Sequence, residues 1–252
     1  MARVSALALS SSRSRAALLF TLRDSRVSQD MNAVASNQCG TRRVRSRLGA
    51  IAHTLLGFAL LTAPPASAAV ECEPFTWQEE RLNYTAAKDQ LRVSQVESHH
   101  LDADTENLIR GMTGSVGDDL NFVVRYSPNH HRALMALVRL SLKDKTPRPH
   151  GVSIPVECYL LRGLEFAPSD AEVLKIYATY LSRLGRNTES LTRFEQAEQL
   201  APDDPVVAYN IGLLLVEKRD FEKARTYAKK AYAAGIQFPG LRDKLARQGQ
   251  WR

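Results

Sequence analysis

The strongest constraint on the fold is a pattern of small and large apolar residues that repeats every 34 residues in the C-terminal half of the chain. The first full period runs from Ala171 to Asp204. Its key positions, 4, 7, 8, 11, 20, 24, 27 and 32, hold Leu174, Tyr177, Ala178, Leu181, Ser190, Phe194, Ala197 and Pro202. Small side chains let two helices cross closely, and larger ones fill the space beside the crossing. Gly185 lies where the chain must turn between the helices, and Pro202 ends the second helix.

The next period, 205–238, repeats this pattern and then departs from it. Its matching residues are Ala208, Ile211, Gly212, Leu215, Ala224 and Ala231, with bulk supplied by Phe221 and Tyr227. Ala228 replaces the aromatic residue at position 24, and the closing proline comes late, as Pro239. These departures predict a terminal repeat. Residues 240–252 then predict a short capping helix, which end repeats need for solubility, with apolar side chains at Leu241, Leu245 and Trp251.

The two periods resemble the tetratricopeptide repeat, a unit of two antiparallel helices. The resemblance implies an all-α fold, a right-handed superhelix of antiparallel helix pairs, over residues 105–239. Upstream, Asn129–Lys143 and Val156–Ala167 predict a third pair, with an inserted loop that makes it about six residues longer than the standard repeat. Leu120 and Val123 fit a fourth, weaker unit.

Residues 70–104 do not follow the period and predict an irregular N-terminal extension. Within it, Gln90–Val96 alternates in polarity, which predicts an extended segment. Trp77 and Tyr84 offer apolar anchors with which the extension could fold back onto the helices.

Residues 1–69 predict a leader that directs export. Arginines precede an apolar run from Leu48 to Ala63, and small residues follow, which is the order of a secretory signal. We expect a signal peptide at about 42–68, cleaved before Ala69 or one residue later, and therefore a periplasmic protein. Without cleavage the protein would be anchored in the inner membrane, although the run is shorter than the roughly 18 residues that span a bilayer.

The start of the leader leaves two further alternatives open. The first thirty residues make a long preface to a bacterial signal, so that translation could begin at Met31. An Arg- and Ser-rich, acid-poor start is also typical of a mitochondrial transit peptide, but the complete export signal downstream disfavours that interpretation.

The formal net charge of +7 belongs to the leader. Residues 1–69 hold nine of the 34 basic residues and two of the 27 acidic ones, which leaves 25 of each sign afterwards. A nucleic-acid-binding protein needs clustered lysine and arginine where phosphates lie. The balanced remainder therefore predicts no nucleic-acid partner.

Two cysteines remain after the leader, Cys72 and Cys158, in a compartment where disulfides persist. We hypothesise that they pair and tie the N-terminal extension to the helices; the alternative is two separate buried thiols. Cys72 lies past the cleavage site, which excludes lipid attachment there.

The resemblance also implies a ligand-facing set, because in this family the first helix of each pair lines the concave groove. The matching positions are Arg132, Met135, Arg139, Lys175, Thr179, Arg183, Tyr209, Asn210 and Leu213. The groove would be basic at one end and mixed at the other, which suits an extended peptide or a helix carrying acidic groups. These residues could equally be ordinary solvated helix faces. Asn210 matches an asparagine that some members use to bind a C-terminal carboxylate, but Ile176 breaks that motif one repeat earlier.

The remaining polar motifs predict no catalytic residues, no metal site and no cofactor. The stretch with Gly111, Gly114 and Gly117 lacks the lysine of a phosphate-binding loop and is typical of a turn. The neighbouring histidines at 99–100 and at 130–131 point in different directions from one backbone, so that neither pair alone makes a site. Asp118 and Asp119 precede an apolar run, a place typical of a helix cap.

Three functions from different classes fit this sequence. The first is a periplasmic scaffold or adaptor that binds a partner protein or peptide in the groove. The second is a subunit or regulator of an envelope transport or assembly machine, held in a membrane-associated complex. The third is an enzyme or metal-binding protein that uses the histidines and the inserted loop.

Overall fold

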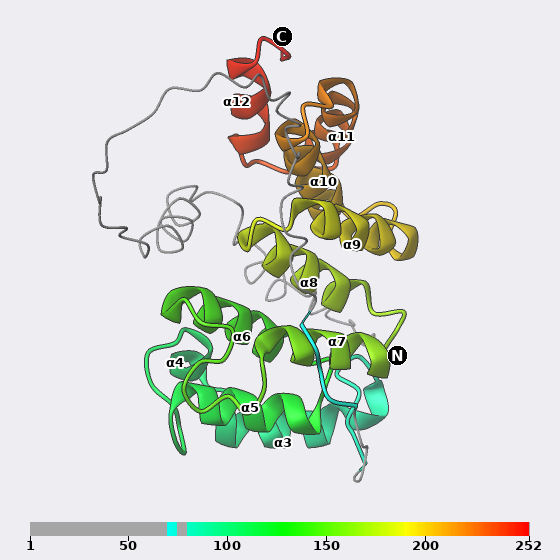
Figure 1. Ribbon diagram of the computed structural model, residues 1–252. Coiled ribbons are helices and arrows are strands. Elements are labelled where there is room, and N and C mark those ends of the chain that lie inside the picture. The colour runs from blue at the N-terminus through cyan, green and yellow to red at the C-terminus, as the bar shows by residue number, and fades with distance from the viewer. Residues whose placement is uncertain (1–69, 75–79, 252) are drawn as a thin grey trace, which may run out of the picture. The chain divides into compact units, whose positions relative to one another are not determined.

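The computed structural model describes residues 70–74 and 80–251, all of which belong to one compact unit of the chain (Figure 1). Every regular element in these ranges is helical, which confirms the all-α prediction. The predicted leader, with the signal peptide expected in it, and Trp77 lie outside the described residues. The elements are η1 (Ala87–Asp89), α3 (Gln90–His100), α4 (Ala103–Glu106), α5 (Val116–Tyr126), α6 (His131–Asp144), α7 (Val156–Phe166), α8 (Ala171–Arg183), α9 (Asn187–Leu200), α10 (Pro205–Glu217), α11 (Phe221–Ala233) and α12 (Gly240–Arg247).

The period of the sequence is visible in the helix boundaries. Helix α10 begins exactly one period after α8, and α11 begins one period after α9. Both first helices have an aspartate at the N-cap, Asp170 and Asp204, whose side chain accepts hydrogen bonds from two backbone N–H groups of the first turn. Both are followed by a residue with positive φ, Gly185 and Arg219, and these two are again one period apart. The sequence thus repeats the start and stop signals of the helices together with their apolar positions.

Successive helices lie side by side from α5 to α12, and α8 joins two apolar cores (Figure 1). The N-terminal core is built from α5, α6, α7 and one side of α8, including Val173 and Tyr177. The C-terminal core takes Leu174 and Ala178 from the other side of α8 and adds α9 to α12. A helix that is buried on several sides needs apolar residues around its circumference, and α8 has them.

The inserted loop between α6 and α7 packs against the start of α5. A Cβ built on Gly117, in the first turn of α5, would lie 1.9 Å from the carbonyl oxygen of His150. One built on Gly151 would lie 2.3 Å from Ser115 Oγ. Only glycine permits such an approach of two backbones. Gly117 therefore positions the insertion, while Gly111 and Gly114 lie in the predicted turn.

One local prediction was wrong: Gln90–Val96 is not extended but forms the first two turns of α3. The alternation covers only a short stretch, and most of its residues are good helix formers with no glycine or proline. Val93 is buried and Val96 packs against the N-terminal core, a spacing that fits one helix face. The N-terminal extension is therefore helical from Ala87 to His100.

The start of the extension folds back onto the helices. The backbone N–H of Leu82 donates to the carbonyl of Tyr126 at 2.8 Å, and the N–H of Tyr84 donates to Asn129 Oδ1 at 3.0 Å. The ring of Tyr84 also lies 4.2 Å, between centroids, from the ring of His130. Tyr84 thus serves as the anchor that the sequence predicted.

Within the described ranges, no helix has the length and apolar character needed to cross a membrane.

Candidate functional site

The candidate site is the surface of the first helices α6, α8 and α10 at the nine predicted groove residues, here called the first-helix surface. On α6, Met135 is buried in the N-terminal core. Arg132 lies between Glu97 of α3 and Glu106 of α4, and its Nη1 is 2.9 Å from Glu97 Oε1. Arg139 donates to the backbone carbonyl of Glu106. Helices α3 and α4 thus engage the charges at this end of the surface.

On α8, Lys175 is buried and its charge is balanced. Its Nζ lies 2.6 Å from Glu172 Oε2 and 2.7 Å from Asp204 Oδ2, the N-cap of α10. Burial by itself would lower the pKa of Lys175, but these two carboxylates raise it above its usual value. Lys175 therefore joins two repeats and does not offer a free cation.

Thr179 and Arg183, one and two turns further along α8, are only partly buried. The hydroxyl of Thr179 donates to the carbonyl of Lys175 at 2.8 Å, a bond within its own helix. Together with Arg132 and Arg139 on the neighbouring helix α6, they are the residues of the first-helix surface that are not buried, and Arg132 is paired with the acids of α3 and α4. This part of the surface is basic.

On α10 the prediction of an exposed groove does not hold. Tyr209, Asn210 and Leu213 are 3%, 8% and 2% exposed. Residues 207–216 are all buried because α10 packs against α9, α11 and α12. The Asn210 side chain donates to the carbonyl of Val206 in its own helix, so that it is not free to bind a carboxylate.

Tyr209 is the clearest case of this burial. Its ring meets those of Tyr232 and Phe238 edge-on, with centroid distances of 6.5 and 6.0 Å. Burial raises the pKa of its hydroxyl to about 12. Tyr209 is thus a core residue beneath α12. The sequence carried a signal for this, since 205–216 contains almost no polar side chain and a helix apolar all round is buried.

The predicted pairing of Cys72 with Cys158 is present as a disulfide, with 5.6 Å between the two Cα atoms. Cys158 lies in the buried face of α7. The bond therefore attaches the segment before Glu73 to the middle of the helical body.

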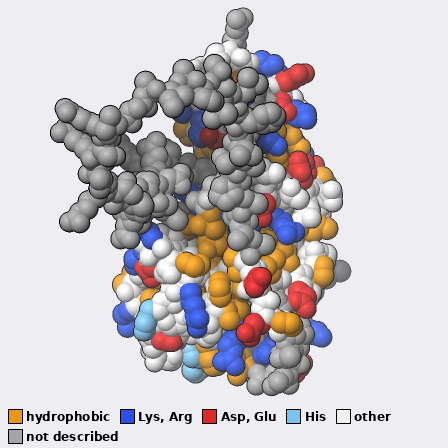
Figure 2. Space-filling model, viewed as in Figure 1, with side chains coloured by type: hydrophobic (Ala, Val, Ile, Leu, Met, Phe, Trp, Pro, Cys, Tyr) orange, Lys and Arg blue, Asp and Glu red, His pale blue; other side chains and the backbone are white. Residues whose placement is uncertain are grey.

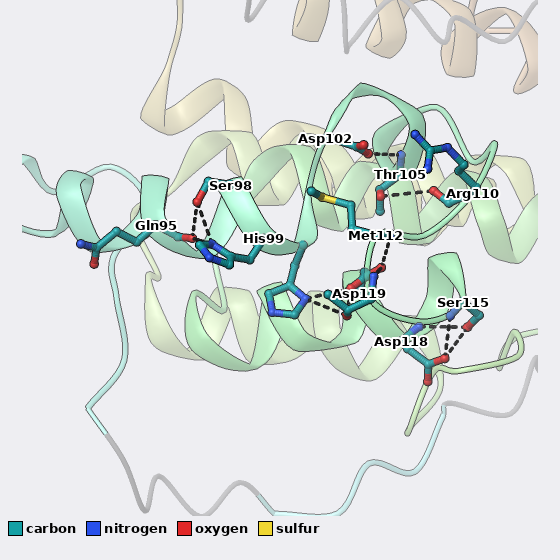
Figure 3. Close-up of polar contacts among 12 residues, drawn as sticks. Gln95, Ser98, His99, Asp102, Thr105, Arg110, Met112, Ser115, Asp118 and Asp119 are labelled. Carbon is teal, nitrogen blue, oxygen red and sulfur yellow. Dashed lines mark hydrogen bonds and ion pairs between the residues drawn. The ribbon is translucent and has the colours of Figure 1, made fainter.

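Asp119, in the first turn of α5, is the centre of a compact polar cluster (Figure 3). His100 belongs to this cluster. Asp119 Oδ2 accepts from the backbone N–H groups of Met112 and Thr113, and Oδ1 accepts from the Thr113 hydroxyl at 2.6 Å. His100 Nδ1 lies 2.8 Å from the same Oδ1. Burial alone would raise the pKa of Asp119, but these hydrogen bonds lower it below its usual value. The buried carboxylate organises the loop before α5.

An aspartate that orients a histidine is also a component of hydrolytic sites, in which a nucleophile lies beside the histidine. The ring of His100 stacks on Phe122 at 3.9 Å between centroids and borders a depression of about 290 Å³. The described residues that line this depression include no serine, threonine or cysteine. The hydroxyl of the cluster is that of Thr113, which donates to Asp119 and lies 3.3 Å from His100 Nδ1. The contacts of the cluster therefore tie the loop before α5 to α3 and α5.

The neighbouring acids and histidines have separate structural contacts. Asp118 forms a capping box with Ser115, as Figure 3 shows, which bears out the predicted cap. His99 Nδ1 contacts the hydroxyl of Ser98 and the carbonyl of Gln95 on its own helix. Among the described residues, no group of three or more histidine, cysteine or acidic side chains is placed to hold a metal ion.

His130 and His131 begin α6 and face different partners. His130 is the N-cap: its Nδ1 accepts from the N–H of Ala133, and its Nε2 lies 3.0 Å from Glu97 Oε1. His131 Nε2 lies 2.8 Å from Asp170 Oδ2, at the N-cap of α8. These contacts connect the starts of neighbouring helices.

Positive and negative side chains alternate over the visible face of the described residues, with apolar side chains between them (Figure 2). This agrees with the balanced charge of residues 70–252.

No protein-family model and no curated protein sequence matches this chain. Membership in the tetratricopeptide-repeat family therefore stays a prediction that depends on the residues of the period and on the helix boundaries.

Proposed function

We propose that residues 105–239 form a right-handed tetratricopeptide-type superhelix that binds a protein or peptide partner. The observation that carries this proposal is the recurrence of α8 and α9 as α10 and α11 one period later. Both first helices, α8 and α10, have an aspartate N-cap and are followed by a residue with positive φ. Stacked helix pairs of this kind present an extended surface that recognises another chain.

The partner-binding part of the first-helix surface is the region around Arg139, Thr179 and Arg183, because the α10 part is buried. We propose that the protein acts as a periplasmic adaptor, exported by the leader. The disulfide between Cys72 and Cys158 supports this compartment, since such bonds persist in oxidising surroundings. The balanced charge after the leader argues for a protein rather than a nucleic acid as the partner.

The test is site-specific photo-crosslinking in intact cells, with the crosslinker placed at Thr179. Thr192 is the matched control because it is an exposed threonine on the second helix α9, and its hydroxyl likewise bonds within its own helix. A discrete adduct from Thr179 alone would support the adaptor and allow the partner to be identified by mass spectrometry. An adduct from Thr192 alone would support a machine subunit held by its second helices. Without any adduct at Thr179, binding at the first-helix surface must be abandoned.

A further inference from the structure

Helix α12 packs as if it were the first helix of another repeat. Its buried residues Leu241 and Leu245 lie one period after Val207 and Ile211, which are buried residues of α10. A Cβ built on Gly212 would lie 2.6 Å from Leu241 Cδ2, so that α12 sits closely against α10. The period therefore continues beyond the last full helix pair.

The continued 34-residue period also shows which residues of α12 correspond to residues of the first-helix surface. Lys244 and Arg247 lie one period after Asn210 and Leu213, two of the predicted groove positions. In α10 those positions are buried, whereas in α12 Lys244 is half-buried and Arg247 is exposed. The terminal helix thus places two cations where a partner-binding residue is expected.

These two cations border a cavity of about 410 Å³ between the end of α10, the start of α11 and α12. Its lining comprises Val216, Glu217, Arg219, Phe221, Lys244, Arg247 and Gln248. Arg219 adds a third cation from the turn between α10 and α11. Glu217 is the acid of this lining, and it accepts a hydrogen bond from Lys244. Within the described part of the chain, no acidic side chain is paired with Arg219 or Arg247.

The residues that line the cavity indicate the chemical class of its ligand. Three cations against one acid favour an anion, and arginine guanidinium groups bind carboxylates through two parallel hydrogen bonds. Val216 and Phe221 supply an apolar wall beside the charges, which suits the methylene groups of an acidic side chain or its apolar neighbour. A polyanion would need a longer basic track than this cavity offers, and residues 70–252 as a whole hold equal numbers of basic and acidic residues.

We propose that this cavity binds carboxylate side chains of an acidic segment in the partner protein, with Arg219 and Arg247 as the direct ligands and Lys244 in support. The proposal rests on the proposed scaffold function and names the chemistry of its partner.

The experiment measures fluorescence anisotropy of a labelled peptide with the repeated sequence Gly-Glu-Leu against the purified protein, and of a matched peptide with glutamine for glutamate. The double variant Arg219→Gln, Arg247→Gln removes both guanidinium groups from exposed positions, so that folding is preserved. The control double variant Lys88→Gln, Lys229→Gln changes the net charge equally at exposed positions that do not line the cavity. Circular dichroism checks that all variants are folded.

We expect the glutamate peptide to bind the wild-type protein, to bind the arginine double variant about tenfold more weakly, and to bind the control variant unchanged. Binding should also weaken as salt is added, because the contacts are at the surface. The proposal is overturned by equal binding of the glutamine peptide, by equal weakening in both double variants, or by no binding to the wild type. If one of these results is obtained but the Thr179 adduct still forms in the arginine double variant, the scaffold function is retained and only the acidic-segment site is rejected.

Discussion

At the scale of single residues, His130 occupies a place that aspartate fills elsewhere in the chain. Asp170 and Asp204 cap α8 and α10, and His130 caps α6 through its Nδ1. Because Nδ1 accepts from a backbone N–H, the proton of the neutral ring lies on Nε2, which donates to Glu97. Burial lowers the pKa of His130 below its usual value despite the nearby carboxylate. The imidazole therefore stays neutral and connects α6 with α3.

This arrangement predicts that His130→Asn lowers the free energy of unfolding by about 1–2 kcal/mol at pH 7.5. Asparagine preserves the cap but loses the bond to Glu97. The stabilisation by His130 is fully present above the unfolded pKa of roughly 6.5 and is lost as the pH falls below it. Below that pH the unfolded chain binds a proton on this imidazole, whereas the folded protein, in which the pKa is lower, does not. Urea unfolding at pH 7.5 and 5.5 should show the difference between wild type and variant shrinking by about 1 kcal/mol. A difference that is constant with pH would contradict the assignment of a neutral imidazole.

At the scale of helices, the first helix of each pair ends in the same way. Lys145, Gly185 and Arg219 have φ values of 52°, 76° and 61°. In each case the next residue donates its N–H to a carbonyl near the end of the helix, such as Arg186 to Leu181 at 2.9 Å. This termination satisfies a carbonyl at the helix end, and glycine adopts it without strain. The structure thus uses a glycine at one of three equivalent turns and strained residues at two.

We therefore expect opposite effects from two exchanges at equivalent positions. Gly185→Ala should destabilise the protein by about 1 kcal/mol through the left-handed conformation alone, because nothing lies within 4 Å of the added Cβ. Lys145→Gly should stabilise it by about 0.5 kcal/mol, since relief of strain outweighs the added freedom of the unfolded chain. Lys145→Ala serves as control because it removes the charge but retains the strain. Thermal or urea unfolding that gives equal stabilities for Lys145→Gly and Lys145→Ala would disprove the strain argument.

The sequence predicted the helices from α6 to α12 from local signals: an apolar stripe, a stop signal and, for α6, α8, α10 and α11, an N-cap. The prediction of an extended segment at α3 was wrong. The short stretch fits a strand pattern and a helix pattern equally well, and the burial of Val93 in tertiary contacts favours the helix. The sequence predicted the disulfide from the compartment and the number of cysteines. The contact between Gly117 and His150 joins the first turn of α5 to the inserted loop and could not be derived from either segment alone.

The candidate site was less predictable than the fold because exposure depends on how repeats stack. The family pattern assigned Tyr209 to a groove, yet the packing of α12 over α10 buries it. The same stacking brings Arg219 and Arg247 to one cavity from different elements. Helical periodicity identifies which residues share a face, but whether that face meets solvent depends on the next element in the chain.

At the scale of the whole described unit, long-range ties connect the N-terminal extension to the repeats. Asn129 links Asn83 to Asp170, and Arg132 links α6 to the acids of α3 and α4. The disulfide between Cys72 and Cys158 adds a covalent tie over a sequence separation of 86 residues. Buried hydrogen bonds and ion pairs of this kind stabilise the protein only when all their partners are in place. The disulfide therefore supports these interactions by holding the extension against the helices.

The disulfide between Cys72 and Cys158 should contribute substantially to the stability of the described unit. In the chain-entropy account, closing a loop of this length removes freedom from the unfolded state, and the expected stabilisation is roughly 4–5 kcal/mol. The variant Cys72→Ala, Cys158→Ala should lose about that much in urea unfolding without reductant, and dithiothreitol should lower the wild-type midpoint toward that of the variant. The variant itself should be insensitive to dithiothreitol, which controls for other effects of the reagent. A wild-type midpoint that does not respond to dithiothreitol, together with a variant of equal stability, would mean that the extension is held by its noncovalent contacts with α5 and α6 alone.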